Sequence, residues 1–188
     1  DGRALDAGAA QAARVAKELG QIEVLATSAG IAGPNAPVVD YDPKAWAEVM
    51  DINLTGIFNC CKSVLPYMVE RGYGRVVNIA SIAGLGGNPV DMKTIAYNTS
   101  KGAVINFTRA LAGEWGQYGI TVNAICPGFF PSKMTKGTLE AMGEDRLKAS
   151  APLKRLGDDE DLKGLCLLYA SDAGKHISGQ WLAVDGGV

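Results

Sequence analysis

Short apolar runs alternate with longer amphipathic stretches along the whole chain, and this alternation constrains the fold more than any other feature. Four runs read as strands: 22–27, 74–81, 120–126 and 180–186. Four stretches with apolar residues at a period of 3.6 read as helices: 4–20, 42–72, 97–115 and 158–171. The first three strands are apolar or β-branched at their centres, which is typical of strands covered on both faces. The pattern predicts an α/β fold, a doubly wound parallel sheet with helices on both faces.

Local signals place the helix ends. Asp42 precedes Pro43, which predicts an N-cap aspartate with proline in the first turn. Glycines stand where helices should stop, at positions 20, 72 and 116. Pro66 predicts a kink near the end of the long 42–72 helix. The polar stretch 129–157 is long for a crossover, which predicts a lid or binding loop, with a plain helical excursion as the alternative.

Composition bounds the partners. The 188 residues fit one domain, and 18 basic against 20 acidic residues give a net charge of −2, which favours neither nucleic acid nor an anionic membrane surface as a partner. No apolar run approaches the ~18 residues of a spanning helix. Four cysteines without metal-site spacing and a single His176 predict buried thiols, no metal site and a reducing cytoplasm as the location.

The stretch "YNTSK" (97–101) begins one of the predicted helices. Tyr97 and Lys101 lie four residues apart and so share a helix face. The strand 74–81 ends at Ser81, and ligands of open parallel sheets bind beyond the carboxyl ends of strands. A phenol with a pKa of about 10 is a poor acid or base at neutral pH, and a nearby cation lowers that value. These three groups predict proton transfer to or from an oxygen that Ser81 holds, with Lys101 lowering the pKa of Tyr97.

Six motifs in order give the chain a resemblance to a known family. "LATSAG" (25–30), "DINLTG" (51–56), "GRVVNIAS" (74–81), "YNTSKGA" (97–103), "CPGFFPSKM" (126–134) and "GQWLAVDGG" (179–187) together resemble the short-chain dehydrogenases/reductases. The resemblance covers essentially the whole chain. It implies a Rossmann-like fold, NAD or NADP as the cofactor, and interconversion of a secondary alcohol and a ketone.

The resemblance also implies catalytic roles by position. Tyr97 is the general acid/base, Lys101 lowers its pKa and bonds the nicotinamide ribose, and Ser81 orients the substrate oxygen. Asn53 helps to hold a water that links Lys101 to solvent.

Other positions would contact the cofactor. Ala29 and Gly30 allow its close approach, and Pro127 with Gly128 shapes the nicotinamide pocket. Ser132 takes the place of a threonine that commonly contacts the carboxamide.

The chain departs from the family pattern in three ways. It has no strand with a Gly-rich phosphate-binding turn at its start, so we expect residues 1–188 to be a single Rossmann-like domain in the C-terminal portion of a longer chain. Thr27 and Ser28 replace two asparagines. The loop between Ser81 and Tyr97 is about three residues longer than the commonest spacing, which predicts a bulge at the substrate mouth.

Several alternatives stay open on sequence alone. A non-catalytic nucleotide-binding or scaffold protein competes with the oxidoreductase. Within the oxidoreductases, a 3-oxoacyl-thioester reductase competes with a sugar or polyol dehydrogenase, and the lysines of "PSKMTKG" (131–137) suit acidic or carrier-bound substrates. A second apolar stripe on the 43–71 and 97–115 helices, with the C-terminal strand, predicts a homotetramer. The other expected partner is a small alcohol or ketone.

Overall fold

The computed structural model describes residues 5–188. Its sheet has four parallel strands in the order β1-β2-β3-β4, which is also their order along the chain. The strands are β1 (Val24–Thr27), β2 (Gly74–Ile79), β3 (Ile120–Pro127) and β4 (Trp181–Val184). The helices are α1 (Leu5–Leu19), α2 (Pro43–Met50), α3 (Gly56–Arg71), α4 (Ile95–Trp115), α5 (Lys136–Met142), α6 (Glu144–Ser150) and α7 (Lys163–Ala170). All four predicted strands and the parallel α/β class are confirmed.

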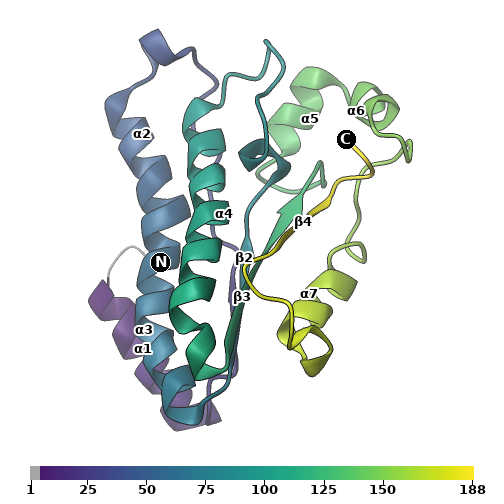
Figure 1. Cartoon of the computed structure of the whole chain (residues 1–188). Coiled ribbons are helices and arrows are strands. Elements are labelled where there is room, and N and C mark those ends of the chain that lie inside the picture. Colours follow the sequence, from purple (N-terminus) through teal and green to yellow (C-terminus); the bar gives the residue numbers. More distant parts are fainter. Residues whose placement is uncertain (1–4) are drawn as a thin grey trace.

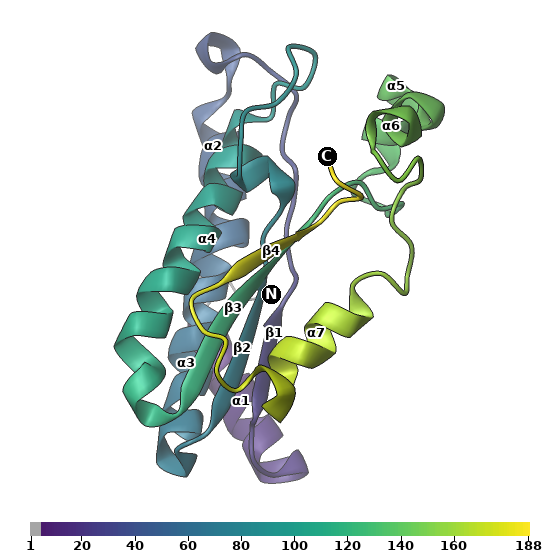
Figure 2. The ribbon, with the colours of Figure 1, turned by 45° about the vertical axis from the view of Figure 1, so that its right-hand side comes forward.

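Helices cover both faces of the sheet, as Figure 1 and Figure 2 show. Alternate strand residues point to opposite faces. Val76 and Val122 belong to a core shared with α1, α3 and α4, whereas Val77 and Ile125 pack with Tyr169 of α7. Each central strand is therefore apolar on both sides, which explains the unbroken apolar runs in the sequence.

The predicted helix 42–72 is two helices joined by a π-helical turn, Asp51–Thr55. Asp42 caps α2 by accepting a hydrogen bond from the backbone N–H of Lys44 at 3.0 Å. The wide turn puts Asn53 inside the protein, fully buried. Such turns are rare and often occur at functional sites.

The helix stops are partly as predicted. Gly72 ends α3 in the left-handed conformation at φ 68°. Gly116 follows α4 at φ −56°, so it continues into a short 3-10 turn, and Gly119 at φ 75° makes the left-handed stop instead. The chain needs the extra turn to bring Ile120 back into the sheet beside Gly74.

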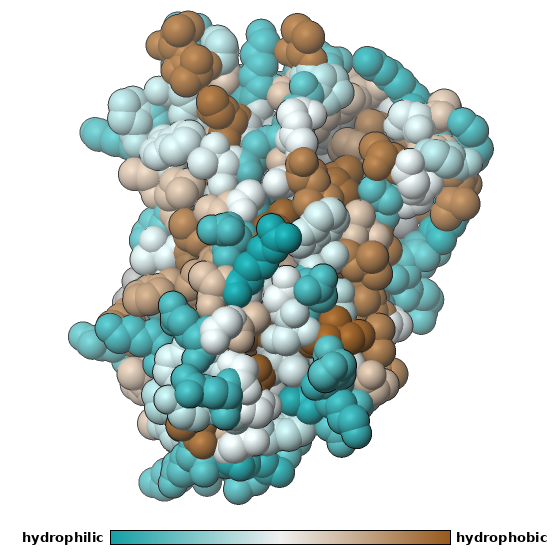
Figure 3. Space-filling view, in the orientation of Figure 1, coloured by the Kyte–Doolittle hydropathy of each residue, from teal (hydrophilic) through white to brown (hydrophobic). Residues whose placement is uncertain are grey.

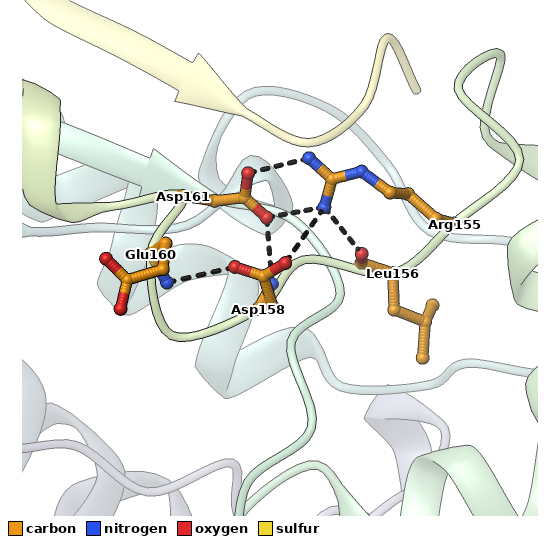
Figure 4. Close-up of polar contacts among 5 residues, drawn as sticks. All are labelled: Arg155, Leu156, Asp158, Glu160 and Asp161. Atoms are coloured by element: carbon orange, nitrogen blue, oxygen red, sulfur yellow. Dashed lines mark hydrogen bonds and ion pairs between the residues drawn. The ribbon is translucent and has the colours of Figure 1, made fainter.

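The stretch 129–157, predicted to be a lid or binding loop or else a helical excursion, is partly helical in the structure. It contains the short helices α5 and α6, which stand beyond the carboxyl ends of the strands (Figure 2). Behind them the chain returns to α7 through a polar clamp (Figure 4). Arg155 donates from both terminal nitrogens to Asp161 at 2.6 Å, and the backbone N–H of Asp158 donates to the same carboxylate at 2.8 Å.

Two loops beyond the strands are joined to each other. The backbone N–H of Ala36 donates to the carbonyl of Lys93 at 3.1 Å, and the Asn35 side chain accepts from the N–H of Lys93 at 2.7 Å. The loop 85–94 lies in the segment between Ser81 and Tyr97 where the sequence predicts a bulge at the substrate mouth. These bonds fix it against the loop after β1.

The expected second apolar stripe is largely internal. Leu65 and Ile105 are 3% and 7% exposed, because α3 and α4 belong to the same core. Phe58 on α3 is 46% exposed, and on β4 Trp181 and Leu182 are 40% and 51% exposed. Within residues 5–188, no helix is long and apolar enough to cross a membrane.

Candidate active site

A cavity of about 530 Å³ opens at the carboxyl ends of the strands. Its walls come from the turn after β2, the loop 85–94, the start of α4, the segment after β3, and α5 with α6. Ser81 and Tyr97 both line it. Figure 3 shows apolar residues at the surface between α4 and the α5–α6 segment, where this cavity lies. The predicted convergence of the strand-end serine and the helix tyrosine is confirmed.

Ser81 begins a tight turn that packs directly on α4. Its hydroxyl accepts a hydrogen bond from the backbone N–H of Ala83 at 3.1 Å. The preceding residue, Ala80, donates its backbone N–H to the carbonyl of Ile125 on β3 at 2.8 Å. The serine is thus held from the strand side, and it lines the cavity together with Tyr97.

Lys101 is 3% exposed, one helical turn after Tyr97. Its ammonium donates to the carbonyl of Ile79, the last residue of β2, at 2.8 Å and lies 5.7 Å from the centre of the Tyr97 ring. Burial lowers the pKa of Lys101 to about 8, and the nearby Cys126 opposes this shift. The lysine therefore joins α4 to the end of the central strand β2.

The structure gives the pKa of Tyr97 the direction opposite to the predicted one. Burial raises this pKa above its usual value of 10.0, and the hydrogen bond with Ser81 opposes the rise. The Lys101 ammonium lies beside the ring and is engaged by the Ile79 carbonyl, so it does not offset the loss of solvent at the hydroxyl. In this structure the phenol is protonated at neutral pH.

Asn53 is held by three hydrogen bonds. Its side-chain oxygen accepts from the N–H of Ile31 at 2.8 Å, and its amide donates to the carbonyl of Ile31 at 2.9 Å and to the hydroxyl of Ser100 at 3.0 Å. Ser100 in turn donates to the carbonyl of Tyr97 at 2.8 Å. Asn53 thus links the loop after β1 to the catalytic helix, and Ser100 is a link that the sequence analysis missed.

Gly30 lies where a cofactor could approach the buried lysine. A Cβ placed on Gly30 would lie 3.5 Å from the Lys101 ammonium and 3.3 Å from the side-chain oxygen of Asn53. A side chain there would fill the space in front of the ammonium. Because glycine leaves this backbone bare, the loop that includes Ala29 and Gly30 leaves room in front of the Lys101 ammonium.

The segment after β3 forms the facing wall. Pro127 ends β3, and the N–H of Gly128 donates to the carbonyl of Val184 at 2.9 Å. A Cβ on Gly128 would come within 2.7 Å of the Asp185 Cβ, so this close approach requires glycine. Gly128 and Asp185 both line the cavity.

Ser132 lies outside the cavity wall, and Thr135 lies in it. The hydroxyls of Ser132 and Thr135 are 2.9 Å apart, and the N–H of Ser132 donates to Thr135. The two residues form one polar turn just before α5. Matching the sequence to the family motif position by position selects Ser132. Such matching cannot show which of the two neighbouring residues of the turn lines the cavity, and in the structure it is Thr135.

The loop 85–94 contributes cavity residues that no sequence motif had indicated. Asn88 and Thr94 line the cavity and bond each other at 2.7 Å. Asn98, next to Tyr97, exchanges hydrogen bonds with Asn88 at 2.9 and 3.0 Å. The loop is therefore fastened to the first turn of the catalytic helix. Among residues 5–188, no group of three His, Cys, Asp or Glu side chains could hold a metal ion.

Comparison with known proteins places this arrangement among nicotinamide-dependent enzymes. The family described as enoyl-(acyl carrier protein) reductase matches residues 3–188. The 3-oxoacyl-(acyl-carrier-protein) reductase FabG of Staphylococcus epidermidis is 37% identical over 174 residues, 93% of this chain and 69% of that protein.

Two solved structures are similar over almost the whole chain. A gluconate 5-dehydrogenase from Burkholderia cenocepacia, in complex with NADP and tartrate, has a TM-score of 0.93 and 31% identity, covering 99% of this chain and 72% of the other. An NAD+-bound xylitol dehydrogenase has a TM-score of 0.92 and 35% identity, covering 100% of this chain and 76% of the other.

Proposed function

The chain belongs to the short-chain dehydrogenase/reductase family, and from this premise we propose that Ser81, Tyr97, Lys101 and Asn53 are its catalytic group. The protein is an NAD(P)-dependent oxidoreductase that acts on CH–OH groups. The observation that carries the assignment of residues is that Ser81 and Tyr97 line one cavity of about 530 Å³, with Lys101 buried one helical turn after Tyr97. A scaffold has no need of a buried lysine behind such a pair.

The cofactor is NAD or NADP, as in the structural relatives. In our proposal Lys101 and the bare backbone of Ala29–Gly30 hold the ribose, and Pro127, Gly128 and the polar turn at Ser132 and Thr135 border the nicotinamide. When bound, the nicotinamide gives or accepts the hydride.

The side chains of the protein move the proton. For reduction of a ketone, Ser81 donates a hydrogen bond to the carbonyl oxygen, and the Tyr97 phenol transfers its proton to that oxygen. The raised pKa of Tyr97 keeps this proton in place at neutral pH. For oxidation of an alcohol the phenolate must form, and Lys101 is the cation held beside the Tyr97 ring. Asn53 fixes the loop and helix around the lysine.

Both substrate classes expected from the sequence are represented among the proteins similar to this chain. A 3-oxoacyl reductase and sugar or polyol dehydrogenases are among the relatives. The largely apolar cavity accommodates either an acyl chain or the carbon face of a polyol.

The assembly we propose is a homotetramer. Exposed Phe58 on α3 supports one two-fold contact, and exposed Trp181 and Leu182 on β4 support another. Light scattering of the natural protein at micromolar concentration tests this, and a monomer would contradict it. The assignment of residues 1–188 to the C-terminal portion of a longer domain also stays a proposal, and the intact mass of the natural protein tests it.

Tyr97→Phe is the experiment that tests the proposed function. It removes only the hydroxyl that transfers the proton, so kcat should fall about 10²- to 10⁴-fold, while the cofactor Kd and the thermal midpoint stay close to those of the parent. Tyr118→Phe, at a tyrosine 41% exposed in the 3-10 turn that follows α4, is the matched control. Turnover of Tyr97→Phe within tenfold of the parent would overturn the assignment.

A further inference from the structure

Arg146 on α6 lines the same cavity as Ser81 and Tyr97. Among the cavity-lining residues of the described chain, 5–188, it is the one lysine or arginine. The lysines that the sequence suggested do not take this place. Lys133 and Lys136 are absent from the wall, and the Lys136 ammonium lies 3.9 Å from Glu140 on its own helix.

The guanidinium of Arg146 is held by a carboxylate from across the cavity mouth. Its Nη1 lies 3.3 Å from Oδ2 of Asp91, which belongs to the loop 85–94. The Arg146 and Asp91 side chains are 66% and 51% exposed. An exposed ion pair of this kind contributes little to stability. Exchange of Asp91 for another anion therefore costs little, and guanidinium favours planar oxyanions that bind it at two points.

The rest of the wall is mainly apolar, which makes the position of Arg146 distinctive. The apolar residues of the wall include Ile82, Leu85, Phe129, Met134, Met142 and Leu147. Asp185 is the acidic residue of this wall, and its carboxylate accepts the N–H of Gly187 at 2.9 Å. Asp185 is thus engaged by the C-terminal turn.

We propose that Arg146 is a specificity-determining residue that binds an oxyanion, carboxylate or phosphate, at the end of the substrate distant from the reacting oxygen. Asp91 is paired with the guanidinium until that oxyanion displaces it. The inference rests on the proposed function of the same cavity. It assigns the substrate class as an alcohol or ketone with an apolar middle and an anionic end.

Two substrate pairs, each differing in charge, test the proposal on the natural protein. Gluconate is paired with sorbitol, and acetoacetyl-CoA is paired with acetoacetyl-N-acetylcysteamine, which lacks the phosphates. For each pair the readout is the ratio of kcat/KM for the anionic member to kcat/KM for the neutral member. In the parent, a higher ratio for the gluconate pair indicates that the bound group is a carboxylate. A higher ratio for the acetoacetyl pair indicates that it is a phosphate. The variants are Arg146→Gln, Arg146→Lys and Asp91→Asn, with Lys133→Gln as the control at an exposed lysine outside the cavity.

Arg146→Gln should lower that ratio about 10- to 100-fold, because hydrogen bonds to a charged partner are lost. Arg146→Lys should keep part of the ratio, since it retains the charge but not the two-point geometry. Asp91→Asn should raise the ratio up to about 5-fold by removing the competing carboxylate. Lys133→Gln should leave the ratio unchanged.

Other outcomes overturn the proposal. An unchanged ratio in Arg146→Gln would show that no oxyanion binds there, and equal losses on both members of a pair would show a purely structural role for Arg146. A fall of the ratio in Lys133→Gln as large as in Arg146→Gln would show a diffuse charge effect. If the parent turns over none of the four probes while Tyr97→Phe still abolishes activity on another alcohol, the substrate class is wrong and the proposed function stands.

Discussion

Gly84 lies directly against the backbone of Lys101. A Cβ placed on Gly84 would come within 2.6 Å of the carbonyl carbon of Lys101 and 2.7 Å of the N–H nitrogen of Gly102. This contact brings the turn that begins at Ser81 onto α4, at the level of the catalytic lysine. The distance between Ser81 and Tyr97 therefore depends on a residue that has no side chain.

Gly84→Ala should separate the two elements. Neither backbone can yield cheaply, so we expect a loss of roughly 1–3 kcal/mol in the free energy of unfolding, and a fall in kcat of up to about 100-fold from a displacement near 1 Å. Urea unfolding and steady-state kinetics measure the two effects. Gly113→Ala is the matched control, because a Cβ on Gly113 of α4 meets nothing within 4 Å and should stabilise the helix by about 0.5–1 kcal/mol. Equal behaviour of the two variants would contradict the close contact.

Ser100→Ala should weaken the link between Asn53 and the catalytic helix. The substitution removes the hydroxyl that accepts from Asn53 and donates to the Tyr97 carbonyl. We expect a loss of about 1 kcal/mol in unfolding free energy and a lower kcat. Thr99→Ala, at the exposed neighbouring position, should change the free energy by less than about 0.5 kcal/mol. An unaltered kcat in Ser100→Ala would limit the link to a role in stability.

Lys101 should make stability depend on alkaline pH. Burial lowers its pKa from 10.5 to about 8, so between these values the unfolded chain binds a proton that the folded chain does not. The lysine therefore destabilises the fold by roughly 3 kcal/mol below pH 8, and this penalty disappears as the pH rises to 10.5.

The measurement compares the parent with Lys101→Met by urea unfolding between pH 7 and pH 10.5. The stability of the parent should rise relative to that of the variant across the window from pH 8 to 10.5. Lys175→Met, at an exposed lysine, corrects for the loss of a surface charge. A difference between parent and Lys101→Met that stays constant with pH would mean that the ammonium is solvated.

The ion pair between Arg155 and Asp161, behind α6, should lose its stabilising effect at acidic pH. The hydrogen bonds from Arg155 hold the pKa of Asp161 at about 2, below its usual 3.8. A depressed carboxyl pKa contributes stability above its unfolded value and loses it as the pH falls through the folded value. The stabilisation from this pair is therefore complete above about pH 4 and declines toward pH 2.

Arg155→Gln should remove that dependence. The thermal midpoint of the parent should exceed that of the variant at pH 5, and the difference should shrink toward pH 2.5. Arg14→Gln, at an exposed arginine on α1, controls for net charge. A difference independent of pH would show that Arg155 acts through packing rather than through the Asp161 carboxylate.

Local sequence signals predicted what depends on neighbours in the chain. The cap at Asp42 and the shared face of Tyr97 and Lys101 both follow from spacing and residue type. The existence of the four strands was also predicted, but β2 ends at Ile79 rather than at Ser81. The π-helical turn at Asn53 was not predicted, because its five residues carry no signal that separates them from an α-helix.

Contacts between distant segments were beyond the sequence. The Arg146–Asp91 pair joins residues 55 positions apart, and no local pattern relates them. The direction of the Tyr97 pKa shift was wrong for a similar reason. A cation was correctly placed near the phenol, but the extent of burial, which decides the shift, depends on the packing of the whole cavity wall.

The π-helical turn Asp51–Thr55 also sets the rotation of α3 about its axis relative to α2. An α-helix advances by about 100° per residue, so removal of one residue from this turn would rotate α3 by that angle relative to α2. Met68 and Leu65, now 0% and 3% exposed, would leave the core. Asn53 would lose its hydrogen bond from the N–H of Ile31. Insertions and deletions should therefore be tolerated in the 85–94 loop and rejected in this turn, although both segments lie near the same cavity.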